Sequence, residues 1–342
     1  MISSYTSWQP LRECVVGRVY PSNYFDHIQV DSVRKQLDRI LDETEQDLDN
    51  LAKIIREFGA VVHRPSLPDK DLFQELQIRF KNVAPPPLTP RDHQITFGNR
   101  LLRLLPLPEL DSVCDDALAG GGIVINPHMG AYDPDCVVAG AVASCILRVG
   151  TDVFFDNSDW MTPAQSQWIV ENILGPDYRI HEAVTDGHGD AVFAILKPGV
   201  ILTTKHDDQI DLQKEFPGWE VLRLWDSSID ACMRIGQFKE ENFNGRWYLH
   251  DETPTDEFRN YVDQYLNQWT GLVSETIFDV NCLVLDEQHV IFSSHNPTVA
   301  EFCRRHHITP IVAPLRHQYF WDGGISCCTQ DIRREGGLET YL

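Results

Sequence analysis

Positive charge and long apolar runs are scarce in this sequence. Lys and Arg number 29 against 51 Asp and Glu, which gives a formal net charge of −22 over 342 residues. Nucleic acids and anionic membrane surfaces both require clustered cations on the protein. No apolar run reaches the roughly 20 residues of a transmembrane helix, and the first residues lack a signal-peptide pattern. We therefore expect a cytoplasmic protein that binds neither nucleic acid nor membrane.

Cysteines are few and follow no metal-binding or disulfide pattern. There are nine, an odd number, and no Cys-x-x-Cys pair occurs among them. Most lie in apolar segments, where cysteine acts as a small buried hydrophobic residue. A zinc site is therefore not expected, and free thiols in a reducing compartment are the simplest interpretation.

Five segments share one pattern, a short β-rich run, a tight turn and a second β-rich run. They begin at Glu13, Gln94, Ser144, Ala191 and Asn281. Gly, Asn, Asp or Pro occupies most of the turns, and each segment is predicted to form a β-hairpin. Five unrelated hairpins in an α+β protein would give the same pattern, so the repeat alone does not decide the architecture.

Helices are predicted between these hairpins, because apolar residues recur there at helical spacing. The predicted ranges are 33–58, 162–173, 255–269 and 296–302, and a strand is expected from Thr309. Residues 82–90 and 118–135 are expected to be long loops. Neither loop has the composition of a flexible linker, so residues 1–342 are predicted to form one domain with 42% hydrophobic residues to build its core.

Three polar segments could carry chemistry. The first contains Gly323 and Gly324 followed by Cys327 and Cys328. If these cysteines lie on a strand, their side chains point to opposite faces, so only one of them can face a given site. Two structural cysteines in a buried strand would look the same in the sequence.

The second segment contains His188 and Asp190, and the third contains Arg91 and Asp92. In an extended chain, His188 and Asp190 would point to the same side, which suits proton transfer combined with cation binding. A polar loop before a strand is the alternative for this pair. A solvated ion pair in a turn is the alternative for Arg91 and Asp92.

Together these segments resemble the amidinotransferase family related to glycine amidinotransferase, and the matching stretches occur in the same order. They are Pro90-Arg91-Asp92, Gly175-PDYRIH, His188-GD, Lys197-PGVIL, Val280-NCLVLDE and Gly323-GISCCTQDIRR. The resemblance implies an α/β fold, the pentein-type α/β-propeller, with five ββαβ modules around a pseudo-fivefold axis. The five predicted hairpins agree with this architecture.

The resemblance also implies roles for four residues. Cys327 matches the nucleophile, His188 the general acid–base, and Asp190 and Asp92 the carboxylates that hold the donor guanidinium. Carboxylates can pair with a guanidinium through forked hydrogen bonds, and a thiolate can attack its weakly electrophilic carbon. Amidino transfer through an amidino-cysteine would need no metal or organic cofactor. The expected partners are a small guanidino donor and a primary amine acceptor.

One departure from the family pattern affects the catalytic histidine. In an ungapped match the family Asp that pairs with this histidine aligns with Val142, and a gapped match could recruit Asp133 or Asp135 from the preceding loop instead. A histidine without such a partner has no fixed tautomer, and its cation is not stabilised. We therefore expect low transferase activity unless another carboxylate supports His188.

Further departures affect the neighbour of the nucleophile and the donor site. Ser326 occupies a position that is usually His in the family. The family's carboxylate-binding Arg and a substrate-binding Ser fall near Asp207 and Glu275. A donor without an α-carboxylate, such as agmatine, should then bind at least as well as arginine unless Lys205 or His206 compensates.

Three hypotheses for the function follow. The chain could transfer an amidino group between amines, hydrolyse a guanidine as a deiminase or dihydrolase does, or bind a guanidino ligand or a protein partner without catalysis. The C-terminal motif favours the transferase, whereas Val142 and Ser326 keep the non-catalytic hypothesis open. The acceptor amine stays open, and a homodimer is the oligomeric state to test.

Overall fold

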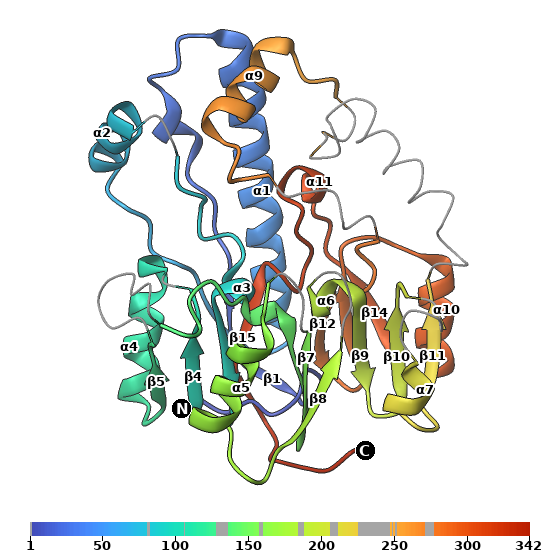
Figure 1. Ribbon diagram of the computed structural model, residues 1–342. Helices are drawn as coiled ribbons and strands as arrows, with labels where there is room; N and C mark the ends of the chain where they lie inside the picture. Colours follow the sequence, from blue (N-terminus) through green and yellow to red (C-terminus); the bar gives the residue numbers. More distant parts are fainter. Residues whose placement is uncertain are drawn as a thin grey trace.

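The computed structural model describes residues 2–80, 83–105, 107–127, 136–156, 160–183, 188–205, 211–224, 247, 249, 252–270 and 277–342. Their strands form five three-stranded sheets (Figure 1). In four of the sheets two antiparallel strands are followed by a helix and a third, parallel strand.

These four ββαβ modules follow one another along the chain. The first consists of β3 (Gln94–Phe97), β4 (Arg100–Arg103), α4 (Asp111–Ala119) and β5 (Ile123–Ile125), and the second of β6 (Ile146–Val149), β7 (Asp152–Asp156), α5 (Pro163–Asn172) and β8 (Arg179–Ala183). The third consists of β9 (Phe193–Lys197), β10 (Val200–Thr203), α7 (Leu212–Glu215) and β11 (Glu220–Arg223). The fourth consists of β12 (Leu283–Asp286), β13 (His289–Phe292), α10 (Pro297–Arg305) and β14 (Thr309–Val312).

The fifth module joins the two ends of the chain. The C-terminal strand β15 (Thr329–Arg334) pairs antiparallel with β1 (Leu11–Val16), and α1 (Asp31–Glu57) then leads to β2 (Val61–His63), which is parallel to β1. The hairpin predicted from Glu13 is therefore wrong, although the five-module propeller itself is confirmed. The N–H of Gly17 donates to the carbonyl of Cys328, which continues the pairing of β1 with β15 by one residue.

The helices agree with the predicted ranges where the local signals are strong. α5 begins at Pro163 behind a capping box formed by Thr162 and Gln165, and Thr255 caps α9 (Asp256–Tyr265). The helix predicted to reach Trp269 ends at Tyr265. The helices α2 (Lys70–Phe80), α4 and α7 were not predicted, and the loop expected over 118–135 includes β5.

α1 organises the largest apolar cluster, and the short elements complete the fold. One face of α1 buries Val33, Leu37, Leu41, Leu48 and Ile55, and α9 packs against this helix above the sheets in Figure 1. The short helical elements are η1 (Ser22–Phe25), α3 (Pro90–His93), η2 (Pro108–Leu110), η3 (Ala143–Cys145), α6 (Gly189–Val192) and α11 (Gln318–Trp321). No helix among the described residues is long and apolar enough to cross a membrane.

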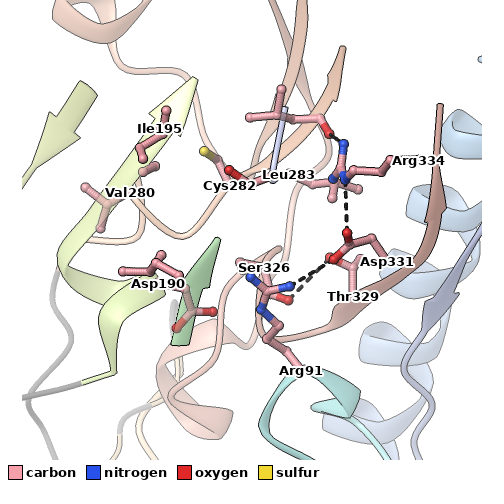
Figure 2. A pocket seen from close by; sticks show the side chains of 14 residues that line it. Arg91, Asp190, Ile195, Val280, Cys282, Leu283, Ser326, Thr329, Asp331 and Arg334 are labelled. Carbon is pink, nitrogen blue, oxygen red and sulfur yellow. Dashed lines mark hydrogen bonds and ion pairs between the residues drawn. The ribbon is translucent and has the colours of Figure 1, made fainter. Parts of the chain in front are cut away.

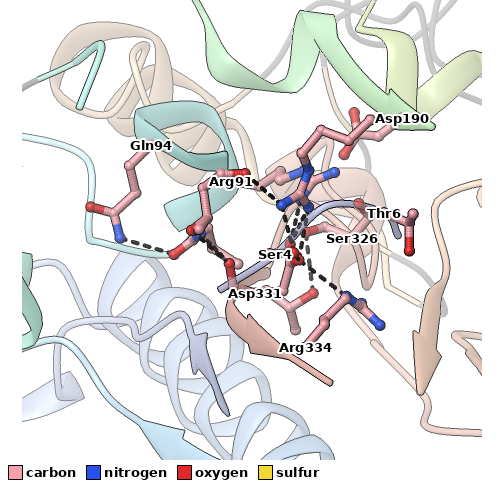
Figure 3. A network of polar contacts seen from close by, with 12 residues as sticks. Ser4, Thr6, Arg91, Gln94, Asp190, Ser326, Asp331 and Arg334 are labelled. Carbon is pink, nitrogen blue, oxygen red and sulfur yellow. Dashed lines mark hydrogen bonds and ion pairs between the residues drawn. The ribbon is translucent and has the colours of Figure 1, made fainter. Parts of the chain in front are cut away.

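A buried carboxylate, Asp331 on β15, connects several modules (Figures 2 and 3). It accepts hydrogen bonds from Arg91 at 3.0 Å, from Arg148 at 2.7 and 2.8 Å, and from Arg334 at 3.1 Å. Ser4 also donates to it. Arg334 in turn donates to the carbonyls of Gln9 and Val284, and Arg148 donates to the carbonyl of Thr96 on β3. The network therefore reaches residues of four of the five sheets.

The arginines determine the charge state of Asp331. Burial alone would raise the pKa of this carboxyl, but the charges of Arg148, Arg334 and Arg91 outweigh burial and hold the pKa well below its ordinary value. A depressed pKa means that the ion pairs stabilise the fold above about pH 4, where an unfolded Asp is ionised. This contribution is lost as the pH falls through the folded-state pKa.

We predict that Asp331→Asn lowers the free energy of unfolding by about 3–5 kcal/mol, because it leaves three buried arginines without their counter-charge. Urea titration at pH 7 measures this loss, and the difference from the wild type should shrink as the pH falls below 4. Glu335→Gln is the control, because the Glu335–Arg12 pair is exposed and should contribute no more than about 1 kcal/mol. Equal small losses in both variants would contradict the central role of Asp331.

Candidate active site

Cys327 lies in a turn immediately before β15. The turn spans residues 325–328, and the thiol is buried. The side-chain amide of Asn281, which precedes β12, donates to Sγ at 2.9 Å, and the backbone N–H of Cys327 donates to Oδ1 of the same amide at 3.1 Å. Sγ also lies 3.9 Å from Oδ2 of Asp190. The thiol therefore faces a carboxylate and an amide.

Cys328 lies on the other side of the turn, within the apolar cluster around α1. Burial raises the pKa of its thiol to about 12, so this sulfur is a protonated core group. The two cysteines thus face different environments, as expected. The reason differs from the prediction, because the pair lies in a turn whose Cys328 N–H bonds to the carbonyl of Gly324, not on a strand.

Asp190 reaches the sulfur from α6, one helical turn before β9. The expected extended geometry at His188 and Asp190 is wrong, since residues 189–192 are helical. The site still receives both side chains. Asp190 is buried, and its Oδ1 has no hydrogen-bond partner among the residues that the structure describes.

Burial is the main influence on the ionisation of Asp190. It raises the pKa of the carboxyl, and the nearby Asp92 adds to this effect, while the charges of Arg91 and His188 and a hydrogen bond with Ser326 oppose it. A buried carboxylate with an unpaired oxygen is costly unless a cation or a donor completes its hydrogen bonds. This carboxylate is therefore suited to receive a cationic group.

His188 contacts Asp92 rather than a residue near Val142. Nδ1 of His188 lies 3.6 Å from Oδ1 of Asp92, and Ser144 donates a 2.7 Å hydrogen bond to the same oxygen. Trp160 packs edge-on against the imidazole, with 5.4 Å between ring centroids. Asp92 is thus the carboxylate that the described residues bring to His188.

The structure describes only some of the other residues that the sequence suggested for the site. Val142 is buried in an apolar cluster, and its N–H bonds to the carbonyl of Trp160. The backbone carbonyl of Lys205 accepts a hydrogen bond from Arg223. The predictions for Asp133, Asp135, His206, Asp207 and Glu275 lie outside the described residues.

Arg91 is not a solvated turn residue. It is buried and paired with Asp331, and its backbone N–H bonds to the carbonyl of Cys327 at 3.5 Å. Asp92, the next residue, is thereby held beside the site. The buried network and the site thus share one short helix, α3.

A small cavity of about 40 Å³ lies between the site and the buried network (Figure 2). Arg91, Asp190, Ser326, Asp331 and Arg334 are among its lining residues, whereas Cys327 and His188 are not. A space of this size takes a few water molecules at most. Asp190 borders both this space and the sulfur of Cys327.

Every module contributes to the site from the same position, the segment before its first strand. Asp92 precedes β3, Ser144 precedes β6, Asp190 precedes β9, Asn281 precedes β12 and Cys327 precedes β15. Sequence reasoning did not identify Asn281 or Ser144. Both begin segments that were predicted as hairpins, so the equivalence of their positions was the available signal.

Comparisons with known proteins agree with the resemblance to amidinotransferases. No protein-family model matches the chain. Inosamine-phosphate amidinotransferase 1 of Streptomyces glaucescens is 22% identical over 100% of this chain and 99% of its own length, and mitochondrial glycine amidinotransferase of Xenopus laevis is 22% identical over 100% and 85%. The predicted resemblance to the amidinotransferases is confirmed.

Solved structures show the same fold. An inosamine-phosphate amidinotransferase from Streptomyces griseus superposes with a TM-score of 0.67, at 19% identity, over 100% of this chain and 99% of its own. DDAH from Pseudomonas aeruginosa superposes with a TM-score of 0.55, at 11% identity, over 94% and 99%. The fold is the pentein fold, and it occurs in both of these differently named enzymes.

We predict that Asp190→Asn raises the free energy of unfolding at pH 7 by about 1–2 kcal/mol, because it removes a buried charge with an unpaired oxygen. A raised folded-state pKa means that the native state binds more protons than the unfolded state, so stability falls as the pH rises through that window. The gain should therefore disappear at acid pH, where the wild-type carboxyl is protonated.

Urea titrations of the two proteins at several pH values measure this difference. Asp115→Asn is the matched control, since Asp115 is exposed on α4 and its replacement should change stability little. A variant that is less stable than the wild type at pH 7 would contradict the prediction. That result would mean that attraction to Arg91 outweighs the burial of the charge.

Proposed function

We propose that this protein is an amidinotransferase that moves an amidino group from an arginine-like donor to a primary amine through an amidino-cysteine at Cys327. One observation carries the proposal. A buried sulfur lies 3.9 Å from the carboxylate of Asp190, whose second oxygen has no hydrogen-bond partner in the described part of the chain. In this arrangement the carboxylate could hold a planar cation next to the sulfur, which would act as the nucleophile.

The guanidinium would lie between Asp190 and Asp92. Its N–H groups can donate in a forked arrangement to a carboxylate, which would satisfy the unpaired Oδ1 of Asp190. The positive charge of the ligand would lower the pKa of Asp190 and favour the thiolate form of Cys327. Binding would thus ionise the groups that the chemistry requires.

The reaction would proceed in two balanced steps. In the first, His188 takes the thiol proton, Sγ of Cys327 forms a bond to the guanidino carbon, and the bond to the donor nitrogen breaks. His188 passes the proton to the departing amine. In the second, His188 removes a proton from the acceptor amine, whose nitrogen attacks the same carbon. The carbon–sulfur bond then breaks, and the thiol regains a proton from His188.

Both reported sequence relatives are named as amidinotransferases, and each matches the full length of this chain. This favours transfer over hydrolysis as the proposed reaction. Hydrolysis would begin with the same attack by Sγ, and water would replace the acceptor amine. Loss of ornithine in the first step would then give urea, whereas loss of ammonia would give citrulline. The products therefore separate the two reactions.

We predict that arginine adds the mass of one amidino group to the protein, and that Cys327→Ala abolishes this adduct. Intact-protein mass spectrometry after acid quenching measures it. Cys328→Ala is the matched control and should retain the adduct, since its thiol lies in the apolar cluster. An adduct that persists in Cys327→Ala but is lost in Cys328→Ala would contradict the assignment.

The acceptor is tested by supplying arginine with glycine, lysine, a cyclitol amine or a polyamine. A transferase forms ornithine and a guanidino derivative of one amine. Citrulline or urea formed without an added amine would indicate hydrolysis instead. Binding of arginine without an adduct or any product would favour a non-catalytic relative.

We predict that Asp92→Asn lowers kcat at least about tenfold, because it removes the carboxylate near Nδ1 of His188 and with it the stabilisation of the imidazolium. Steady-state assays across pH measure the effect. Ser144→Ala is the comparison, since it removes only the hydrogen bond to Asp92 and should cost less. Unchanged turnover in Asp92→Asn would show that another group supports His188.

A further inference from the structure

Asn281 holds Cys327 at two points with one side-chain amide. Its Nδ2 donates to Sγ at 2.9 Å, and its Oδ1 accepts from the backbone N–H of the same cysteine at 3.1 Å. The side chain is fully buried. Both the sulfur and the backbone that carries it are therefore fixed by a residue from a different module.

Asn281 is itself held in place, by hydrogen bonds of its backbone and by close packing of its side chain. Its backbone carbonyl accepts hydrogen bonds from the N–H groups of Ile325 and Ser326, and its own N–H donates to the carbonyl of Phe278. Gly324 lies directly against the amide, since a Cβ on that glycine would come within 2.6 Å of Oδ1. The close approach leaves the side chain one orientation.

The hydrogen bonds also fix which amide atom faces the sulfur. The backbone N–H of Cys327 can only donate, so its partner is the amide oxygen and the NH₂ group points to Sγ. A donor at a sulfur favours the thiolate over the thiol. Asparagine supplies this donor without a charge of its own.

Charged groups act on the same sulfur from other elements. Asp190 on α6 lies 3.9 Å away and disfavours a thiolate, and Asp92 on α3 belongs to the same acidic surroundings. Arg91 on α3 and His188 before α6 bring positive charge near Asp190. The side-chain amide of Asn281 is a neutral donor in direct contact with the sulfur. It favours the thiolate, whereas the negative charges of Asp190 and Asp92 disfavour it.

We propose that Asn281 is a positioning residue that orients Cys327 and stabilises its thiolate. The inference deepens the proposed function, because it concerns the sulfur that would form the amidino-cysteine. It does not depend on the identity of donor or acceptor. The reactivity of the thiol in the absence of any guanidino substrate is therefore the appropriate measurement.

The test follows alkylation of Cys327 by iodoacetamide as a function of pH. Alkylation forms a carbon–sulfur bond, releases iodide and passes the thiol proton to the buffer. All proteins carry Cys328→Ser. The tryptic peptide that begins after Arg316 then contains Cys327 as its one cysteine, so mass spectrometry of this peptide reports on Cys327 alone. We expect the pH midpoint of alkylation to rise by about one unit or more in Asn281→Ala, a roughly tenfold loss of rate near neutrality.

Asn281→Asp separates the donor from the shape of the side chain. It keeps the acceptor for the N–H of Cys327 but replaces the NH₂ group with an oxygen, so the midpoint should also rise. Asn50→Asp is the control for the added charge, because Asn50 is exposed on α1 and its replacement should change the protein little. This control should keep the wild-type midpoint.

Unchanged midpoints in both Asn281 variants, with unchanged thermal unfolding, would overturn the proposal. Failure of both variants to fold would also overturn it, since Asn281 would then act on the fold rather than on the sulfur. A shifted midpoint supports it even if no amidino transfer is detected. The outcome is thus distinguishable from failure of the proposed function.

Discussion

The carboxylate of Asp331 is the point at which the modules of this propeller are joined. It pairs with Arg91, Arg148 and Arg334 inside the protein, and Arg334 continues the network to the carbonyl of Val284. Buried charges that are paired in this way specify a geometry, because any displacement leaves an uncompensated ion. The same strand, β15, closes the ring with β1 and follows directly after Cys327. The position of the thiol therefore depends on this network.

Pseudo-symmetry explains how one small site receives side chains from all five modules. The segment before the first strand of each module supplies one of them: Asp92, Ser144, Asp190, Asn281 or Cys327. Three of these segments are single helical turns, α3, η3 and α6. Equivalent positions in a ring of repeats converge on the axis, so residues far apart in the chain become neighbours. The chemistry differs between modules while the backbone plan stays the same.

The site and the network use charge in opposite ways. Asp331 is surrounded by donors, and its low pKa reflects a satisfied ion. Asp190 is buried with one oxygen that no described residue hydrogen-bonds, and its pKa is raised. A carboxylate prepared for a cation is a local source of instability in the free protein, whereas the completed ion network stabilises the framework around it. The fold thus keeps the carboxylate of Asp190 incompletely hydrogen-bonded at the place where a cationic ligand would supply the missing hydrogen bonds.

The sequence by itself determined the elements that short windows encode. Four hairpins, the amphipathic α1 and the capped helices α5, α9 and α10 follow from local periodicity and capping residues, and the motif order identified the fold. The tertiary structure alone decided three things: that β1 pairs with β15, that Cys327 lies in a turn, and that Asp92 reaches His188. Each depends on closing the ring between distant residues. Periodicity reports which face of an element is buried, whereas contacts across the axis depend on how the modules pack together.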